Sequence, residues 1–98
     1  MYASVTSGQI QQGQIDEYVK IWEEQIMPEV KNLAGIVNAY FCINRETHKG
    51  ITLAIYETEA DATATQTSGK YRALLSQLAP MLVMDTITRE GFEVRLHL

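Results

Sequence analysis

Cysteine, histidine and basic residues are scarce in this sequence, and each shortage excludes a class of site. Cys42 is the only cysteine, so no intramolecular disulfide can form, and we expect a reducing, cytoplasmic environment. The two histidines lie far apart and no Cys/His cluster exists, so the sequence predicts no metal site. The eight lysines and arginines are scattered along a chain of net charge −4, which argues against a nucleic-acid partner.

A long hydrophobic run is also missing. The most apolar stretch extends from Leu74 to Met84, is interrupted by Ser76, Gln77 and Pro80, and is too short to cross a bilayer. The first residues lack the basic region and apolar run of a secretion signal. We therefore expect no membrane partner. A chain of 98 residues supports one hydrophobic core, so residues 1–98 should form a single domain.

One amphipathic helix is predicted between Gln14 and Gly35. Apolar residues recur there at three- and four-residue steps, so they share one helical face. These residues are Ile15, Tyr18, Val19, Trp22, Ile26, Val30 and Leu33. Pro28 removes a backbone donor, so the helix should kink or restart there, and Gly35 suits the position after a helix end.

Alternating segments on both sides of this helix predict β-strands. Residues 2–10 weakly predict the first strand, and residues 37–44 alternate cleanly between apolar and polar. A polar connection then leads to a third strand over residues 51–56, so an antiparallel hairpin is expected. The last strand should cover residues 86–98, with Gly91 as a candidate bulge residue.

A second helix should extend from the capping pattern at Thr58 to about Leu78. Its inner face is small in the first half and bulky only in the second half. We expect a break or a loosened turn at Ser68 and Gly69, because glycine lowers helix stability. Pro80 either closes this helix or opens a short extra turn through Met84.

The resulting order, βαββαβ, predicts an α+β ferredoxin-like plait, a four-stranded antiparallel sheet with two helices on one face. We expect the helix-covered face to carry the consistently apolar set, Val37, Phe41, Leu53, Ile55, Phe92, Val94 and Leu96. The bare face would then carry Asn38, Tyr40, Cys42, Thr52, Ala54, Tyr56, Arg95 and His97. Because that second set is more apolar than a solvated sheet face normally is, we infer a homodimer in which a second copy covers it.

Short segments spread over almost the whole chain resemble one known family. They are Ile21-Trp22-Glu23-Glu24, Met27-Pro28 before Leu33-Ala34-Gly35, Tyr40-Phe41-Cys42-Ile43-Asn44-Arg45 leading to Gly50, Tyr56-Glu57-Thr58-Glu59-Ala60-Asp61-Ala62, Leu78-Ala79-Pro80-Met81-Leu82 and Gly91-Phe92-Glu93-Val94. The chain thereby resembles the antibiotic-biosynthesis-monooxygenase-like family of dimeric α+β barrels. The resemblance implies that two plaits pack sheet to sheet into a shared dimeric α/β barrel.

The resemblance also implies an activity. Some members are similar to oxygenases that oxidise electron-rich phenols or quinols without flavin, haem or metal. It therefore implies a cofactor-independent monooxygenase acting on small aromatic or quinol-like substrates. Such sites use an Asn and a Trp one helical turn apart, together with a Tyr and an Arg. Tyr71 and Arg89 match the last two, whereas the only tryptophan, Trp22, lies in the first helix.

The residues themselves predict a pocket between the second helix and the sheet. Ala64 and Thr67 are small and lie near the expected helix break, so they leave volume beside Tyr71. We expect a small hydrophobic or aromatic ligand there, with a floor of Phe41 and Leu53, walls of Trp22 and Tyr71, and Arg89 holding a phenolate. The simpler interpretations are that Trp22 is a core residue and that Arg89 lies on a solvated strand edge.

A second function stays open. The chain could be a non-catalytic dimeric α/β barrel that binds a small metabolite in a stress or regulatory role. The missing Asn–Trp pair favours this alternative, and the Tyr71–Arg89 pocket favours the enzyme. The sequence names no catalytic residue.

Overall fold

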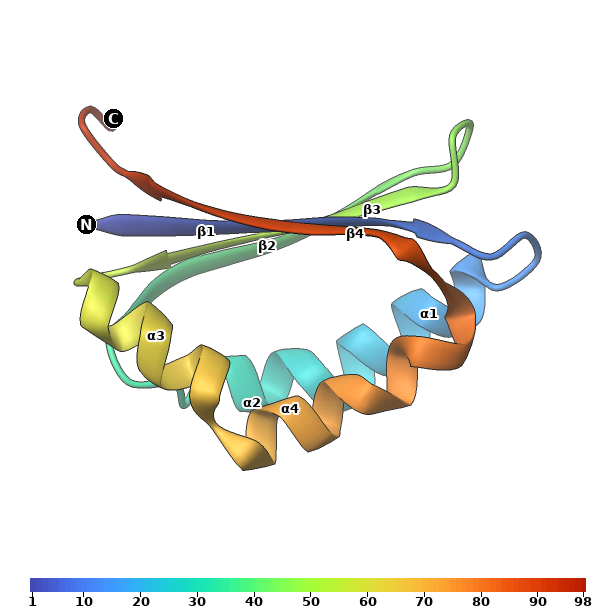
Figure 1. Ribbon diagram of the computed structural model, residues 1–98, viewed down its shortest axis with the longest axis horizontal. Coiled ribbons are helices and arrows are strands. Elements are labelled where there is room, and N and C mark those ends of the chain that lie inside the picture. The colour runs from blue at the N-terminus through green and yellow to red at the C-terminus, as the bar shows by residue number, and fades with distance from the viewer.

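A four-stranded antiparallel sheet forms one layer of the molecule, and all helical segments form a second layer on one of its faces (Figure 1). The computed structural model describes residues 1–98. The strands are β1 (Tyr2–Ile10), β2 (Ile36–Asn44), β3 (Lys49–Tyr56) and β4 (Leu82–Glu93), in the spatial order β2-β3-β1-β4. The helical segments are α1 (Ile15–Ile21), η1 (Trp22–Ile26), α2 (Met27–Val30), α3 (Glu59–Thr67), α4 (Gly69–Leu75) and η2 (Ser76–Met81). The predicted ferredoxin-like βαββαβ plait is confirmed.

The first helix contains a widened turn in its middle. α1, η1 and α2 follow one another directly, and η1 is π-helical: the Met27 N–H donates to the Trp22 carbonyl, five residues back. Pro28 lies in the first turn of α2, the helix position that best tolerates its missing N–H. The expected restart at Pro28 is thus confirmed. Gly35 follows with a φ of 72°, the left-handed backbone expected after a helix end.

The second helix is broken at the predicted place. Thr58 caps α3, because its Oγ1 accepts a 3.2 Å hydrogen bond from the Asp61 N–H. Ser68 is extended, with a ψ of 117°, so α3 ends at Thr67 and α4 begins at Gly69. Ser68 then caps α4 by accepting from the Tyr71 N–H at 3.3 Å. This break lets α4 take a direction of its own, which decides where Tyr71 lies.

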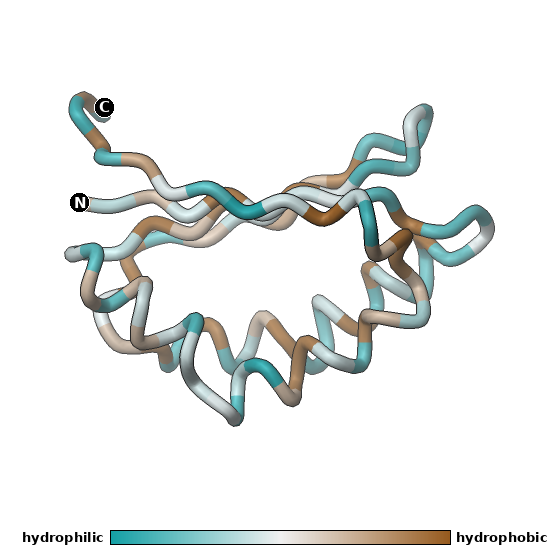
Figure 2. Tube along the Cα trace, in the orientation of Figure 1, coloured by the Kyte–Doolittle hydropathy of each residue, from teal (hydrophilic) through white to brown (hydrophobic).

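The hydrophobic core consists mainly of helix residues. Its fully buried members are Ile10, Ile15, Tyr18, Trp22, Ile26, Val30, Leu78 and Met81. Ile10, the only strand residue among them, is the last residue of β1. The core therefore lies toward one end of the sheet. The apolar stretches in Figure 2 follow the helices and parts of the strands, and the β2–β3 turn is hydrophilic.

Strand pairing assigns the two sheet faces differently from the sequence prediction. Phe41 pairs with Thr52 and Tyr40 pairs with Leu53, and paired residues share a face. Because Phe41 packs against the helices, Thr52, Ala54 and Tyr56 face the helices with it, while Leu53 and Ile55 lie on the bare face. The prediction for this strand is therefore wrong by one position. Phe92 also lies on the bare face, because it pairs with Ala3 beside Ile55, so its prediction is wrong too.

The last strand begins earlier and ends earlier than predicted. β4 extends from Leu82 to Glu93, so Val94, Arg95, Leu96 and His97 lie beyond the strand. Gly91 pairs regularly with Ser4, and the expected bulge there is wrong. The irregularity instead lies between Val83, which pairs with Gln9, and Thr88, which pairs with Ser7. The Gln9 N–H donates to Thr86 Oγ1 at 2.9 Å across this irregular segment.

Candidate functional site

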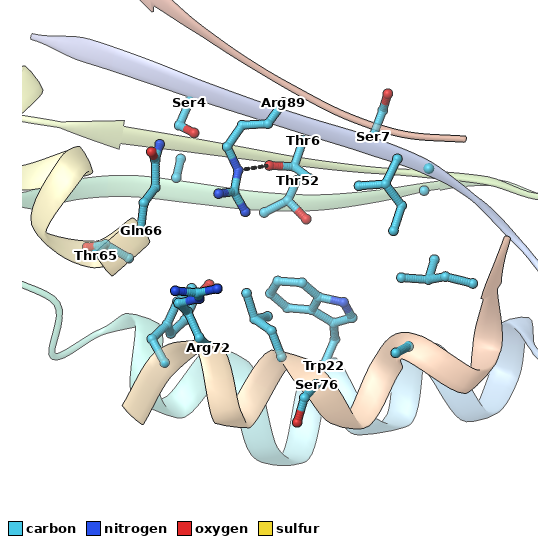
Figure 3. Close-up of a pocket in the computed structure, with 18 of the residues that line it drawn as sticks. Ser4, Thr6, Ser7, Trp22, Thr52, Thr65, Gln66, Arg72, Ser76 and Arg89 are labelled. Carbon is cyan, nitrogen blue, oxygen red and sulfur yellow. Dashed lines mark hydrogen bonds between the residues drawn. The ribbon is translucent and has the colours of Figure 1, made fainter. Parts of the chain in front are cut away.

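A cavity of about 490 Å³ lies between the middle of the sheet and the helices. Its sheet side is lined by small or short polar residues of β1 and β3, namely Ser4, Thr6, Gly8, Gly50, Thr52 and Ala54. Because these side chains of the two central strands are short, they do not fill the space beneath the bulky helix residues. Its helix side carries Tyr71 and Leu75, together with Trp22 (Figure 3). The predicted gap between helix and sheet is thus present.

Four residues in one row across the sheet define the geometry of the cavity. Phe41, Thr52, Thr6 and Arg89 are successive Cα partners on β2, β3, β1 and β4. Adjacent strands lie ~4.8 Å apart, so the row separates the backbones of Phe41 and Arg89 by roughly 14 Å. The two threonines between them are short. A planar ligand can therefore lie over Thr52 and Thr6, between the helices and the sheet.

Trp22 forms the deep end of the cavity. Only 4% of it is exposed, and its ring stacks on Phe41 with centroids 4.8 Å apart and planes 17° from parallel. Phe41 thus supports Trp22 from behind and is not itself among the lining residues. The Trp22 indole Nε1 is buried without a hydrogen-bond partner. Both the core role and the wall position predicted for Trp22 are present in this arrangement.

Tyr18 lies next to this indole. Burial raises the pKa of Tyr18, and the neighbouring Trp22 N–H lowers it by less. That contact is weak, because the Nε1–H does not meet hydrogen-bond geometry with the Tyr18 hydroxyl or with any other group. The indole nitrogen is therefore a buried donor without an acceptor.

Tyr71 projects from α4 into the other part of the cavity. Burial, reinforced by the neighbouring Tyr56, raises the pKa of Tyr71 to about 12, and the nearby Arg89 guanidinium opposes this rise. The phenol is therefore protonated at neutral pH and can donate a hydrogen bond. It cannot act as a base there.

Arg89 reaches into the cavity from the edge strand β4. Its Nε–H donates to Thr6 Oγ1 at 3.4 Å, which holds the guanidinium over the row (Figure 3). The side chain is exposed, as the interpretation of a solvated strand edge required, and it also lines the cavity. Arg72 of α4 is a second exposed arginine in the lining. These exposed arginines and the buried Trp22 mark the outer and inner ends of the cavity.

The structure thus brings together four of the five predicted site residues. Trp22, Tyr71 and Arg89 line the cavity, and Phe41 supports it through Trp22. Leu53 lies on the opposite sheet face, so its predicted place in the floor is wrong, and Thr52 and Ala54 form the floor instead. Tyr56, Gln66 and Arg72 also line the cavity and were not among the predicted site residues. The sequence feature that indicates this floor is the set of small or short polar residues at alternate positions of β3, Gly50, Thr52 and Ala54.

Arginine and tyrosine are the only ionisable residue types in the lining, which contains no Asp, Glu, His, Lys or Cys. No group of three or more His, Cys, Asp or Glu side chains is arranged to hold a metal ion. None of the helices is both long and apolar enough to cross a lipid bilayer. The charged and aromatic side chains of the lining are thus arginine, tyrosine and tryptophan.

Fold and cavity together define an α+β ferredoxin-like plait with a cavity between its sheet and its helices. No family model and no curated protein matches the sequence. Solved structures do match it over its full length, among them antibiotic biosynthesis monooxygenase and NIPSNAP domain proteins. The fold suggested by the resemblance is confirmed.

Three of these structures show the extent of the match. An antibiotic biosynthesis monooxygenase has 9% identity and a TM-score of 0.80, covering 98% of this chain and 100% of its own. A conserved protein from Methanosarcina mazei Go1 has 12% identity and a TM-score of 0.82, with 96% and 92% covered. An uncharacterized NIPSNAP domain protein from Burkholderia xenovorans has 12% identity and a TM-score of 0.72, with 97% and 95% covered. At these identities the comparison establishes the fold alone.

Proposed function

We propose that this protein is a cofactor-independent oxygenase that oxidises a small aromatic or quinol-like substrate in the cavity. One observation carries the proposal: the Arg89 guanidinium is held over an aromatic-walled cavity, next to the protonated Tyr71 phenol. A fixed cation stabilises an oxyanion, so a substrate phenol bound at Arg89 should ionise more readily than in water. The name of the monooxygenase with the same fold agrees with this chemistry.

The reaction can be written with the substrate as the only reductant. The bound phenolate passes one electron to O₂, and the resulting phenoxyl radical and superoxide combine at a ring carbon that carries hydrogen. Loss of water from this peroxide leaves a carbonyl group. The net change removes the ring C–H hydrogen and the phenol proton, adds one oxygen atom as the new carbonyl, and releases the second oxygen atom as water. For a CH₂ group such as that of anthrone, both hydrogens come from that carbon. Tyr71 can donate a hydrogen bond to the peroxide, and the phenol proton passes to solvent at the arginine end.

Oxygen uptake tests the proposal. Purified protein is mixed with anthrone or with 1,4-dihydroxynaphthalene in an oxygen electrode, with a protein-free sample to correct for autoxidation. We expect uptake above background that falls by about a hundredfold in Arg89→Ala, as on removal of one oxyanion donor. Arg95→Ala is the matched control, because Arg95 lies beyond β4 and pairs with Glu93 at 3.2 Å. Equal uptake with and without protein contradicts the oxygenase.

One observation favours a second function, a barrel that binds a small metabolite without turnover. The cavity lining contains no carboxylate, imidazole or amine that could take the substrate proton, and Tyr71 stays protonated. If a ligand raises the melting temperature while no oxygen is consumed, this second function is the better one.

We also propose that the working unit is a homodimer. The bare face of the sheet carries an apolar patch, which we call the bare-face patch and which consists of Ala3, Val5, Tyr40, Ile51, Leu53, Ile55 and Phe92. Tyr40 is 53% exposed and Phe92 is 46% exposed in the single chain. A continuous apolar sheet face of this kind favours burial against another apolar face, and a second copy supplies one.

A further inference from the structure

The charges around the cavity are unbalanced. Two of the four arginines form ion pairs: Arg45 with Asp16 at 3.1 Å, and Arg95 with Glu93 at 3.2 Å. The other two, Arg72 and Arg89, line the cavity, and neither forms an ion pair. Because no acidic side chain lines the cavity, two cations face it uncompensated in a chain of net charge −4. Such a site attracts an anion.

The orientation of Arg89 suits a carboxylate. Thr6 occupies the Nε–H of Arg89, so both terminal amino groups of the guanidinium remain free. Arginine binds carboxylates with pairs of parallel N–H donors, and such charge-assisted bonds are about twice as strong as neutral ones. Gln66 and Arg72 lie across from it on the helical side of the cavity (Figure 3).

A second polar anchor lies at the opposite end of the cavity. The Trp22 indole N–H is buried and unpartnered, and a buried donor without an acceptor costs ~1–3 kcal/mol. In Figure 3 the indole rises from η1 into the cavity, with its nitrogen on the side of the ring away from the Arg89 guanidinium. The nitrogen is covered in the unliganded chain, so a ligand oxygen that satisfies the donor must displace the side chains that cover it.

We propose that the ligand of this cavity is a two-ended aromatic acid, with its carboxylate on Arg72 and Arg89 and a hydroxyl or carbonyl oxygen accepting from the Trp22 indole N–H. Its planar ring system lies over Thr52 and Thr6, where the strand side chains are short. The backbones of Phe41 and Arg89 are roughly 14 Å apart, and the Arg89 side chain and the Trp22 ring extend inward from these ends, so we expect a ligand of at most about two fused rings. This inference takes from the proposed function that the cavity is the substrate site. With such an acid bound, Arg89 holds the carboxylate and the substrate hydroxyl lies at Trp22, whereas a neutral substrate such as anthrone leaves Arg89 free to stabilise its oxyanion.

Three matched probes test the two anchors separately by calorimetry on the wild-type protein. They are 6-hydroxy-2-naphthoate, which has both groups, 2-naphthoate, which lacks the hydroxyl, and 6-hydroxy-2-naphthamide, which lacks the charge. We expect the hydroxy acid to bind at least about tenfold more tightly than the amide. Arg72→Met and Arg89→Met should remove that preference, while Arg95→Met should keep it. Equal affinity of acid and amide for the wild type overturns the carboxylate anchor, without requiring any variant to fold.

The single tryptophan reports on the other anchor. Its indole N–H gives one resonance in a ¹H–¹⁵N spectrum, and a new hydrogen bond moves that proton downfield. We expect this shift with 6-hydroxy-2-naphthoate and a clearly smaller one with 2-naphthoate. Equal shifts with the two acids overturn the indole anchor. Oxygen uptake with neutral anthrone is independent of both results, so this inference can fail while the oxygenase stands, and the reverse.

Discussion

The rings of Trp22 and Phe41 stack at a centroid distance of 4.8 Å, and this contact fixes the inner end of the cavity. Phe41 is half-buried on β2, and Tyr18 packs on its ring at 5.6 Å. Phe41 is therefore a strand residue that contacts the aromatic rings of both Tyr18 and Trp22. Because Trp22 is also the first residue of the π-helical turn, the widened backbone and the stacked ring occur at the same place.

Phe41→Ala should lower the free energy of unfolding by about 2 kcal/mol, at the low end for a phenylalanine because the ring is only half-buried. It should also shift the Trp22 fluorescence to longer wavelength, since water reaches the indole. Urea unfolding followed by fluorescence measures both effects. Val37→Ala is the control on the same strand, where the side chain is 43% exposed, and it should cost less than about 1 kcal/mol. An unchanged emission spectrum in Phe41→Ala would contradict the supporting role.

The raised pKa of Tyr71 should make the protein lose stability in alkali. Below the ordinary pKa of 10.0 the phenol is protonated in both the folded and the unfolded chain. Between 10.0 and about 12 the unfolded chain ionises first, so the free energy of unfolding falls as pH rises, by up to roughly 2 kcal/mol. Tyr71→Phe should reduce this fall, measured by urea unfolding at about pH 9 and about pH 11. Arg89 opposes the rise in the pKa of Tyr71, so Arg89→Met should raise that pKa further. A spectroscopic titration of tyrosinate measures this change, and a lower pKa in the variant would contradict it.

The sequence predicted those features that depend on neighbours along the chain. The helical face with Trp22, the cap at Thr58 and the break at Ser68 each follow from residues within two turns of one another. The βαββαβ order then follows, because few topologies accommodate such elements. Tyr71 was found in this way, since it comes directly after the break.

The sequence failed where a decision depended on pairing between distant strands. Alternation shows that Leu53 and Thr52 face opposite ways, but only pairing with β2 decides which of them meets the helices. The more apolar residue, Leu53, was assigned to the helix-covered face. Thr52 lies there instead, because the floor of the cavity consists of small and polar residues. Arg72 was missed for a related reason: the direction of α4 after Ser68 is set by packing and not by periodicity.

Leu53→Glu should separate the proposed dimer, because it places a charge in the middle of the bare-face patch, beside Val5 and Tyr40. Sedimentation at micromolar concentration should give twice 11.1 kDa for the wild type and 11.1 kDa for the variant. Gln25→Glu adds the same charge at an exposed position of η1 and should leave the dimer intact. A wild-type chain that sediments at 11.1 kDa would contradict the homodimer.

Gly13 and Gly35 both have a left-handed backbone, but a side chain would collide with a neighbouring residue only at Gly35. Gly13 has a φ of 81° and nothing within 4 Å of where a Cβ would lie, whereas a Cβ on Gly35, at a φ of 72°, would collide with the Asp61 side chain. Gly13→Ala should therefore cost about 1 kcal/mol from backbone strain alone. Gly35→Ala should cost clearly more, because Asp61 must move, and its carboxylate also accepts a 3.0 Å hydrogen bond from the capping Thr58 hydroxyl. Thermal unfolding of both variants measures the difference. The Asp61→Ala background should lower the cost of Gly35→Ala but leave it above that of Gly13→Ala, because the Asp61 Cβ remains 2.8 Å from the added methyl group. An undiminished cost there would show that the Asp61 carboxylate is not the cause.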